Sequence, residues 1–204
     1  MLTFIYLVAI TAEAMSGALA AGRRSMDIFG VAVVAFVTAL GGGTVRDLIL
    51  GHFPIGWTQH PTYIYLVIGA GLLTIVIAPY MHHLKRTFLV LDALGLVAFS
   101  LIGCDVALQM NYPVAVVIMA GMITGIFGGI LRDVLCAQVP VVFQREIYAI
   151  VSLAVCGLFL SLRALGVDQE LNTVISFAAG LSLRLAAIYF SWSLPTFAYD
   201  RRWD

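Results

Sequence analysis

The sequence predicts an all-α integral membrane protein with seven transmembrane helices, arranged as two inverted three-helix repeats plus a seventh helix. Three observations support this fold class. Of the 204 residues, 62% are hydrophobic and 11% are charged, with a mean hydropathy of +1.03, whereas a soluble domain carries about 25% charged residues. The hydrophobic residues form runs of roughly 20, which is the length that spans a bilayer. A glycine-rich motif also occurs twice.

The predicted helices follow one another in a single membrane domain, residues 1–204. The first run is hydrophobic apart from Glu13 and ends at Arg23-Arg24. Because its positive charge follows a long run, it is a transmembrane helix rather than a secretory signal. Asp27 can cap the second helix, and loops with proline, glycine or charged residues separate the later runs. The predicted helices are 2–22, 28–50, 62–80, 88–109, 113–136, 147–165 and 173–192.

Positive residues are distributed unevenly between the two sides of the predicted membrane. Seven follow helices one, three, five and seven, whereas the opposite side has Arg163 alone. Since cytoplasmic loops carry the excess of Lys and Arg, we expect a multi-pass protein of the inner (plasma) membrane with its N-terminus outside and its C-terminus in the cytoplasm. The seven are Arg23, Arg24, Lys85, Arg86, Arg145, Arg201 and Arg202.

The motif in the second predicted helix recurs in the fifth. Gly41-Gly42-Gly43-Thr44-Val45-Arg46-Asp47 corresponds to Phe127-Gly128-Gly129-Ile130-Leu131-Arg132-Asp133, with corresponding residues 86 positions apart. Small residues coincide easily in membrane proteins, but a combined match of glycine, arginine, aspartate and proline does not. We therefore interpret the match as an internal repeat. Identical pairs include Ala12/Ala98, Gly17/Gly103, Thr38/Thr124, Gly42/Gly128, Gly43/Gly129, Arg46/Arg132, Asp47/Asp133 and Pro54/Pro140.

Each copy of the repeat contains three predicted helices, over about 2–80 and 88–165. An odd number of helices makes the second copy enter the membrane from the opposite face, which defines an inverted repeat. In proteins of this architecture, the solute path lies at the repeat interface near the midplane, on broken helices. The sequence therefore favours a solute path between the two copies.

The glycines have two interpretations. Each glycine weakens a helix by about 1 kcal/mol, so Gly41–Gly43 and Gly128–Gly129 can unwind or kink it and expose carbonyl groups that coordinate a cation along a water-filled path. Alternatively, small residues let two helices approach each other closely. The adjacent Arg-Asp pair favours a path.

The Arg46-Asp47 and Arg132-Asp133 pairs are costly in a bilayer, where an arginine costs roughly 2.5–3.5 kcal/mol. Because neighbouring residues on a helix do not face each other, we expect each charge to find its partner elsewhere. The candidates are the Arg-Asp pair of the other copy and carbonyl groups freed at the break. Such ion pairs either gate a path or clamp the helix ends.

Of the other charged residues within predicted helices, three are candidates for a role. For Glu13, about mid-helix, a functional or gating role is favoured over a structural one. Asp92, near the cytoplasmic end of its helix, is either functional or interfacial. Arg184 either pairs with Glu13 or extends outwards. No metal-ligand spacing, nucleophile–base set, phosphate loop or nucleic-acid-binding face is visible, so we expect no enzymatic activity, cofactor, metal or nucleic-acid partner.

The two motifs, with Pro54, Trp57 and Asp92-Ala93-Leu94-Gly95-Leu96, resemble the prokaryotic trimeric intracellular cation channels, also catalogued as putative glycine transporters. The resemblance covers nearly the whole chain. It implies seven helices in two inverted repeats plus one, and a homotrimer in membrane lipid. It also implies one pore per protomer, conducting K⁺ and also Na⁺ and lined by helices that kink at Gly41–Gly43 and at Gly128 and Gly129.

The chain departs from many relatives at two positions. Tyr6 stands where they have an aspartate, while Glu13 supplies a carboxylate further along, and Phe127 replaces a third glycine. Two function classes remain open, a passive cation channel and an alternating-access transporter of a small zwitterion such as glycine; a membrane scaffold without a path is a third. Few intramembrane charges and no evident ion-coupling site favour the channel.

Overall fold

The computed structural model describes residues 2–80, 84–144 and 147–192. The predicted features at His82, His83 and Arg145 and in the tail, which includes Arg201 and Arg202, lie outside these residues. Seven longer helices make up the described fold: α1 (Leu2–Gly22), α2 (Ile28–Leu50), α4 (Thr62–Ile77), α5 (Leu84–Gln109), α6 (Val114–Leu135), α8 (Tyr148–Ala164) and α9 (Gln169–Tyr189). The short elements are α3 (Gly56–Gln59), η1 (Ala78–Tyr80) and α7 (Val141–Gln144).

The described helices have the composition of an all-helical membrane protein. Six of them are long and apolar enough to cross a membrane: α1, α2, α4 with η1, α5, α6 and α9. The helix α8 is apolar but has 17 residues and is shorter than these six. The predicted seventh span therefore depends on α8.

Local capping determines where several helices begin. The Asp27 carboxylate accepts the backbone N–H of Gly30 at 2.7 Å, which confirms the predicted cap of α2. The last helix begins earlier than predicted, at Gln169, because the Asp168 carboxylate accepts the backbone N–H groups of Glu170 and Leu171. The helix predicted from residue 88 begins at Leu84.

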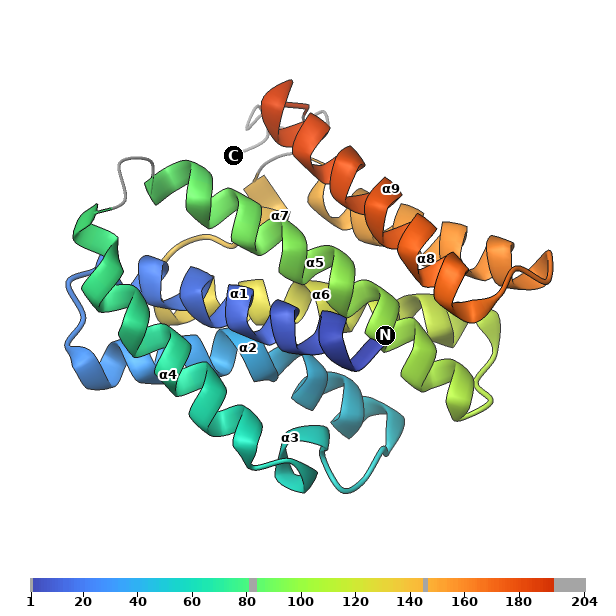
Figure 1. Cartoon of the computed structure of the whole chain (residues 1–204), viewed down its shortest axis with the longest axis horizontal. Helices are drawn as coiled ribbons and strands as arrows, with labels where there is room; N and C mark the ends of the chain where they lie inside the picture. The colour runs from blue at the N-terminus through green and yellow to red at the C-terminus, as the bar shows by residue number, and fades with distance from the viewer. Residues whose placement is uncertain (1, 81–83, 145–146, 193–204) are drawn as a thin grey trace, which may run out of the picture.

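The helices α2 and α6 run in opposite directions through the middle of the molecule (Figure 1). Two hydrogen bonds join their ends: the Tyr112 hydroxyl, just before α6, donates to the Leu50 carbonyl at 2.9 Å. At the other end, Arg24 Nη2, just before α2, donates to the Ala137 carbonyl at 3.1 Å. The carboxyl ends of α2 and α6, where the two Arg-Asp pairs lie, are therefore at opposite ends of the molecule.

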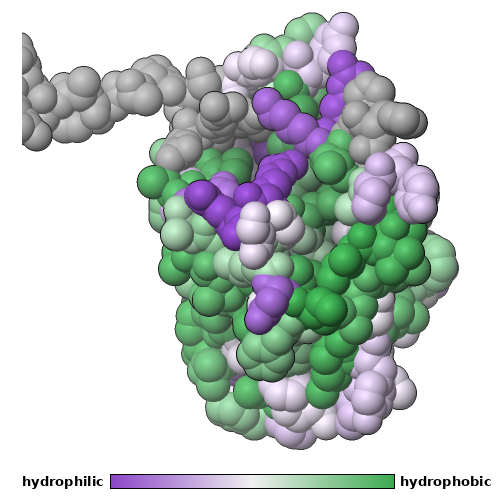
Figure 2. Space-filling view, turned by 90° about the vertical axis from the view of Figure 1, so that its left-hand side faces the viewer, coloured by the Kyte–Doolittle hydropathy of each residue, from purple (hydrophilic) through white to green (hydrophobic). Residues whose placement is uncertain are grey.

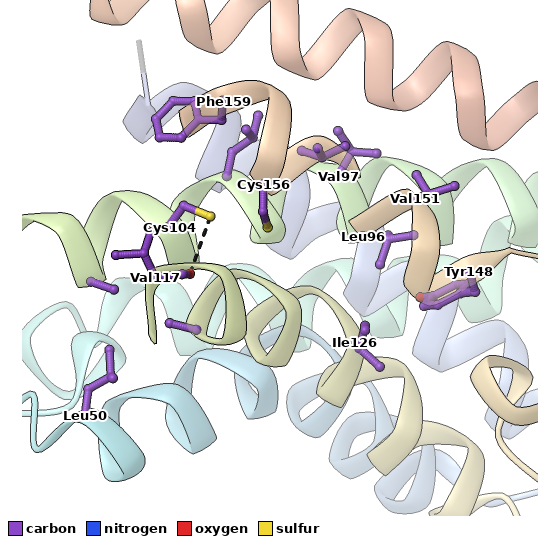
Figure 3. Packing of buried hydrophobic residues seen from close by; sticks show 14 residues of the cluster. Leu50, Leu96, Val97, Cys104, Val117, Ile126, Tyr148, Val151, Cys156 and Phe159 are labelled. Atoms are coloured by element: carbon purple, nitrogen blue, oxygen red, sulfur yellow. Dashed lines mark hydrogen bonds between the residues drawn. The ribbon is translucent and has the colours of Figure 1, made fainter. Parts of the chain in front are cut away.

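A large hydrophobic cluster lies between α5, α6 and α8, whose side chains point toward one another in Figure 3. Leu96, Val151 and Phe159 are almost completely buried there. The Cys104 thiol, also buried, donates to the Val117 carbonyl at 3.6 Å. This cluster packs α6 against α5 and α8.

The central glycines let helices pack closely. A Cβ atom on Gly42 of α2 would overlap the Thr124 carbonyl of α6, and one on Gly128 would overlap the Thr38 carbonyl. Both α2 and α6 continue through their glycines as uninterrupted α-helix. The expectation of an unwound segment is therefore wrong for this structure, because the close helix crossing uses the missing side chains while the backbone hydrogen bonds remain within each helix.

Equivalent contacts occur at positions 86 apart elsewhere in the bundle. A Cβ on Gly17 would meet the Thr38 hydroxyl, and one on Gly103 would meet the Thr124 hydroxyl. Each of these threonines donates to a carbonyl four residues earlier in its own helix, at 2.6 Å. The two halves of the sequence thus make the same small-residue contacts.

Charged side chains gather at the end of the molecule where α1 ends and α2 and α5 begin. This end faces the viewer in Figure 2, where a hydrophilic region is flanked by hydrophobic surface. The mixture of a polar end and apolar flanks is the pattern expected where a helical bundle leaves a bilayer. The exposed charged residues on these helix ends are Arg23, Arg24, Asp27, Lys85 and Arg86.

Candidate ion path and its two arginine sites

The Arg46 site comprises Arg46, Asp47, His52 and Gly56 at the carboxyl end of α2. Arg46 donates from Nε and Nη2 to Oδ1 of Asp47, at 2.9 and 2.7 Å. The other carboxylate oxygen accepts the backbone N–H of Gly56 at 3.0 Å, and Nδ1 of His52 lies 3.0 Å from Oδ1. One buried carboxylate therefore holds both the arginine and the loop that follows the helix.

The end of α2 places these groups together. Gly51 has a φ of 66°, the left-handed conformation that commonly ends a helix. The chain then turns back, so that the His52 backbone N–H donates to the Asp47 carbonyl at 2.8 Å. In the loop, the Trp57 indole donates to the Thr44 hydroxyl at 3.0 Å. The loop is therefore tied to the last two turns of the helix.

The Arg132 site comprises Arg132, Asp133, Asp92 and Ser16 at the opposite end of the bundle. Arg132 donates from Nε to Oδ1 of Asp133 at 2.8 Å, and from Nη1 to Asp92 Oδ1 at 2.6 Å and to the Ser16 hydroxyl at 2.9 Å. Asp133 Oδ2 accepts the backbone N–H of Val141 at 2.9 Å. This arginine therefore connects α1, α5 and α6.

The observed pairs differ from the expected ones. Each arginine binds the aspartate that follows it, rather than the Arg-Asp pair of the other half. The expectation considered only the directions in which adjacent side chains leave a helix. An arginine side chain is long enough to bend back onto its neighbour, and at a helix end the carboxylate also accepts a loop N–H.

Two aromatic rings border the Arg132 site. The guanidinium carbon of Arg132 lies 4.7 Å from the centre of the Phe88 ring, and that of Arg23 lies 4.7 Å from the same ring. The guanidinium of Arg184, which is fully buried, lies 4.6 Å from the centre of the Tyr148 ring. Arg184 therefore does not extend to the surface.

The two sites differ in the space around them. The Arg46 site borders a cavity of about 180 Å³ between α1, α2, α4 and α5, which can hold several water molecules. The described residues around Arg132 leave no room for a water molecule. Gly43 lines the first of these spaces and Gly129 the second. The cavity is lined by Tyr6, Ala39, Leu40, Gly43, Thr44, Arg46, Asp47, His52, Gly56, Trp57, His60, Tyr63, Phe99, Ile102, Val106 and Thr124.

The remaining predicted residues fall around the Arg132 site. Asp92 is 1% exposed and forms an ion pair with Arg132. Glu13 is 3% exposed and lies against Gly95 of α5. Ser16, which sequence reasoning missed, lies three residues after Glu13 and so on the same face of α1. The three-residue spacing from Glu13 is the sequence signal that could have indicated it.

Comparison with known proteins identifies the family. The family described as "Glycine transporter" matches residues 3–79 and 89–164. The UPF0126 inner membrane protein YadS of Escherichia coli is 38% identical over 198 residues, 95% of either chain. This chain belongs to the UPF0126 family. It is a multi-pass membrane protein, and YadS is named as an inner membrane protein.

Solved structures extend the comparison to the fold. The trimeric intracellular cation (TRIC) channel orthologue of Rhodobacter sphaeroides matches this UPF0126 chain with a TM-score of 0.90 at 36% identity, over 94% of this chain and 98% of that one. Another TRIC cation channel matches with a TM-score of 0.88 at 32% identity, over 97% and 98%. The resemblance stated from the sequence is thus confirmed, and this UPF0126 protein has a TRIC-like fold.

Proposed function

We propose that this chain is a channel for monovalent cations, K⁺ and also Na⁺, with a conduction path inside each protomer. The similarity in fold to TRIC cation channels, with a TM-score of 0.90 to the Rhodobacter sphaeroides protein, carries the proposal. These relatives are channels rather than enzymes, and we propose that this chain likewise catalyses no reaction and needs no cofactor.

The proposed path runs along α2 and α6, from the Arg46 site to the Arg132 site. Gly43 and Gly129 line these sites. Because glycine has no Cβ, no side chain covers the helix backbone at these two positions. The cavity at Arg46 serves as the entrance, and the packed Arg132 site closes the other half. Opening then requires Arg132 to leave at least one of its partners, Asp92 or Ser16.

The proposed assembly is a homotrimer in membrane lipid, built from two inverted repeats and a seventh helix. The two stretches matched by the family, 3–79 and 89–164, coincide with the two halves of the sequence. The small-residue contacts at 86-residue spacing support the same division. We place all seven longer helices across the inner membrane, α8 included, with the N-terminus outside and the C-terminus in the cytoplasm.

Glycine transport is the competing function, because the matching family is described as "Glycine transporter". A transporter of a small zwitterion needs polar groups that bind a carboxylate and an ammonium together. Both arginines already bind carboxylates of their own chain. The channel is therefore the better supported function.

The decisive experiment records single-channel currents from the purified protein in a planar bilayer with KCl on both sides. We expect discrete openings, and under a KCl gradient a reversal potential near that of K⁺. Replacing KCl by NaCl on one side should retain current. Absence of discrete openings, together with saturable uptake of radiolabelled glycine into vesicles, would reject the channel in favour of the transporter.

A pair of glycine variants tests the path itself. A Cβ on Gly43 would meet only the Arg46 guanidinium, at 3.8 Å, so Gly43→Leu should fill the cavity without preventing folding. Gly157→Leu on α8 is the matched control, since a Cβ there meets no described atom within 4 Å. We expect the current to be lost in the first variant and kept in the second. Equal currents from both would place the path elsewhere.

A further inference from the structure

Glu13 is a buried carboxylate with an unused oxygen. It lies about mid-way along α1 and is 3% exposed. A Cβ on Gly95 would overlap its carboxylate, so the side chain lies directly against the backbone of α5, one turn after Asp92. Within residues 2–80, 84–144 and 147–192, Oε2 of Glu13 has no hydrogen-bond partner.

Two further carboxylates and an arginine surround Glu13. Asp92, Arg132 and Asp133 all act on it electrostatically. Arg132 is already shared between two aspartates and a serine. Two further arginines lie near this cluster and keep their positive charge, Arg23 against the Phe88 ring and Arg184 against the Tyr148 ring. A buried carboxylate oxygen is costly unless it is paired, and Glu13 Oε2 is the position open to a further cation.

The Arg46 half of the molecule lacks these carboxylates. The position that corresponds to Glu13 at the 86-residue spacing is Phe99, and the position that corresponds to Asp92 is Tyr6. These two rings lie 6.3 Å apart, between their centres, at the border of the cavity. Among the described residues, Asp47 is the carboxylate paired with Arg46, whereas Glu13, Asp92 and Asp133 all lie around Arg132.

We propose that the Glu13 carboxylate, together with Asp92, binds a monovalent cation in the Arg132 half of the protomer. This inference rests on the proposed channel function, in which that cation is the permeating one. Because the described residues around Arg132 leave no room for a water molecule, the cation enters when Arg132 moves off Asp92. It is then held by Glu13 Oε2 and Asp92. Binding to so few oxygens is weak, as conduction requires, because an ion must leave a site as readily as it enters.

The arrangement suits a monovalent rather than a divalent cation. Calcium takes six to eight oxygen ligands, and magnesium demands a near-octahedral shell. Among the described residues, no group of three or more His, Cys, Asp or Glu side chains is placed to hold a metal ion. The site therefore offers charge without the rigid ligand cage that a divalent cation needs.

Cation-dependent thermal stability tests the binding without relying on conduction. The probes are KCl and NaCl, against N-methyl-D-glucamine chloride at equal ionic strength, added to the full chain in detergent. A ligand that binds the folded state raises Tm, so we expect a higher Tm in K⁺ and Na⁺ for the wild type. Glu13→Gln should lose this difference and Glu13→Asp should keep part of it. The matched control, Glu170→Gln on the exposed start of α9, should behave as the wild type.

Several outcomes would overturn the proposal. An unchanged K⁺ effect in Glu13→Gln would place the cation elsewhere, and stabilisation by MgCl₂ at far lower concentration than by KCl would reject the monovalent class. In bilayers, Glu13→Gln should lower the unitary K⁺ conductance several-fold, and the control should not. If the wild type shows the K⁺-dependent Tm but no current, the channel function is rejected and the Glu13 site is retained. If the wild type conducts and Glu13→Gln changes neither the Tm effect nor the conductance, the Glu13 site alone is rejected.

Discussion

Each Arg-Asp pair joins two side chains that follow one another in the sequence, and this geometry could not be predicted from helical spacing. Spacing describes where side chains leave a helix, not how far a long one reaches at a helix end. The cap at Asp27 was predictable because it involves only the backbone N–H three residues later. The role of Ser16 was missed because it depends on which helices pack together.

The ion pair at Arg46 predicts a non-additive response to mutation. Asp47 is 1% exposed, so Asp47→Asn leaves a guanidinium without its carboxylate and should cost up to about 3–5 kcal/mol of stability. The double variant Arg46→Gln/Asp47→Asn strands neither charge and should recover part of this loss. The measurement is the midpoint of thermal unfolding in detergent for both single variants and the double. A double variant as unstable as the two single effects added together would show that the residues act on separate partners.

At the scale of the helices, α2 and α6 pack against each other at glycines, which have no side chain. The sequence correctly marked these glycines, but it could not separate a helix break from a close crossing, since both require small residues. The structure separates them through the neighbours of each position. Gly42 and Gly128 lie against the opposite backbone, whereas Gly43 faces the cavity.

The close crossing predicts opposite effects of the same substitution at two helical glycines. Gly42→Ala places a methyl group against the Thr124 carbonyl and should destabilise the protein by about 1–3 kcal/mol. Gly69→Ala on α4 meets no described atom within 4 Å and should stabilise the helix by up to about 1 kcal/mol. Both effects can be read from thermal unfolding of the purified variants. Similar stability of the two variants would mean that α2 and α6 can separate without loss.

At the scale of the whole molecule, hydrophobic runs predicted most helix positions, because length and composition decide what can span a bilayer. The runs for α1 and α2 agree with the structure at both ends. The difference in packing between the two halves was not predictable from the repeat. The difference depends on which side chain lies near each arginine in the folded protein. Tyr6 lies at the Arg46 site, whereas Asp92 pairs with Arg132.

The charge distribution predicts the orientation of the whole molecule. The exposed end with Arg23, Arg24, Lys85 and Arg86 should face the cytoplasm. A fluorescent protein fused after Asp204 should therefore fluoresce, and alkaline phosphatase fused at the same place should be inactive. The same reporters fused after Gly166, at the other end of the bundle, are the control and should give the reverse pattern. An active phosphatase at the C-terminus would contradict the orientation.

In the proposed channel, the unequal packing of the two halves determines where the membrane voltage falls. Electric potential falls mainly across dry, poorly polarisable material and little across water. In a conducting protomer, the field therefore concentrates in the Arg132 half, while the cavity at Arg46 stays close to the potential of its bath. Moving one elementary charge through the whole field is worth about 2.3 kcal/mol per 100 mV. In the proposed channel, a shift of Arg132 across the packed half would therefore move a gating charge, and the same shift of Arg46 would not.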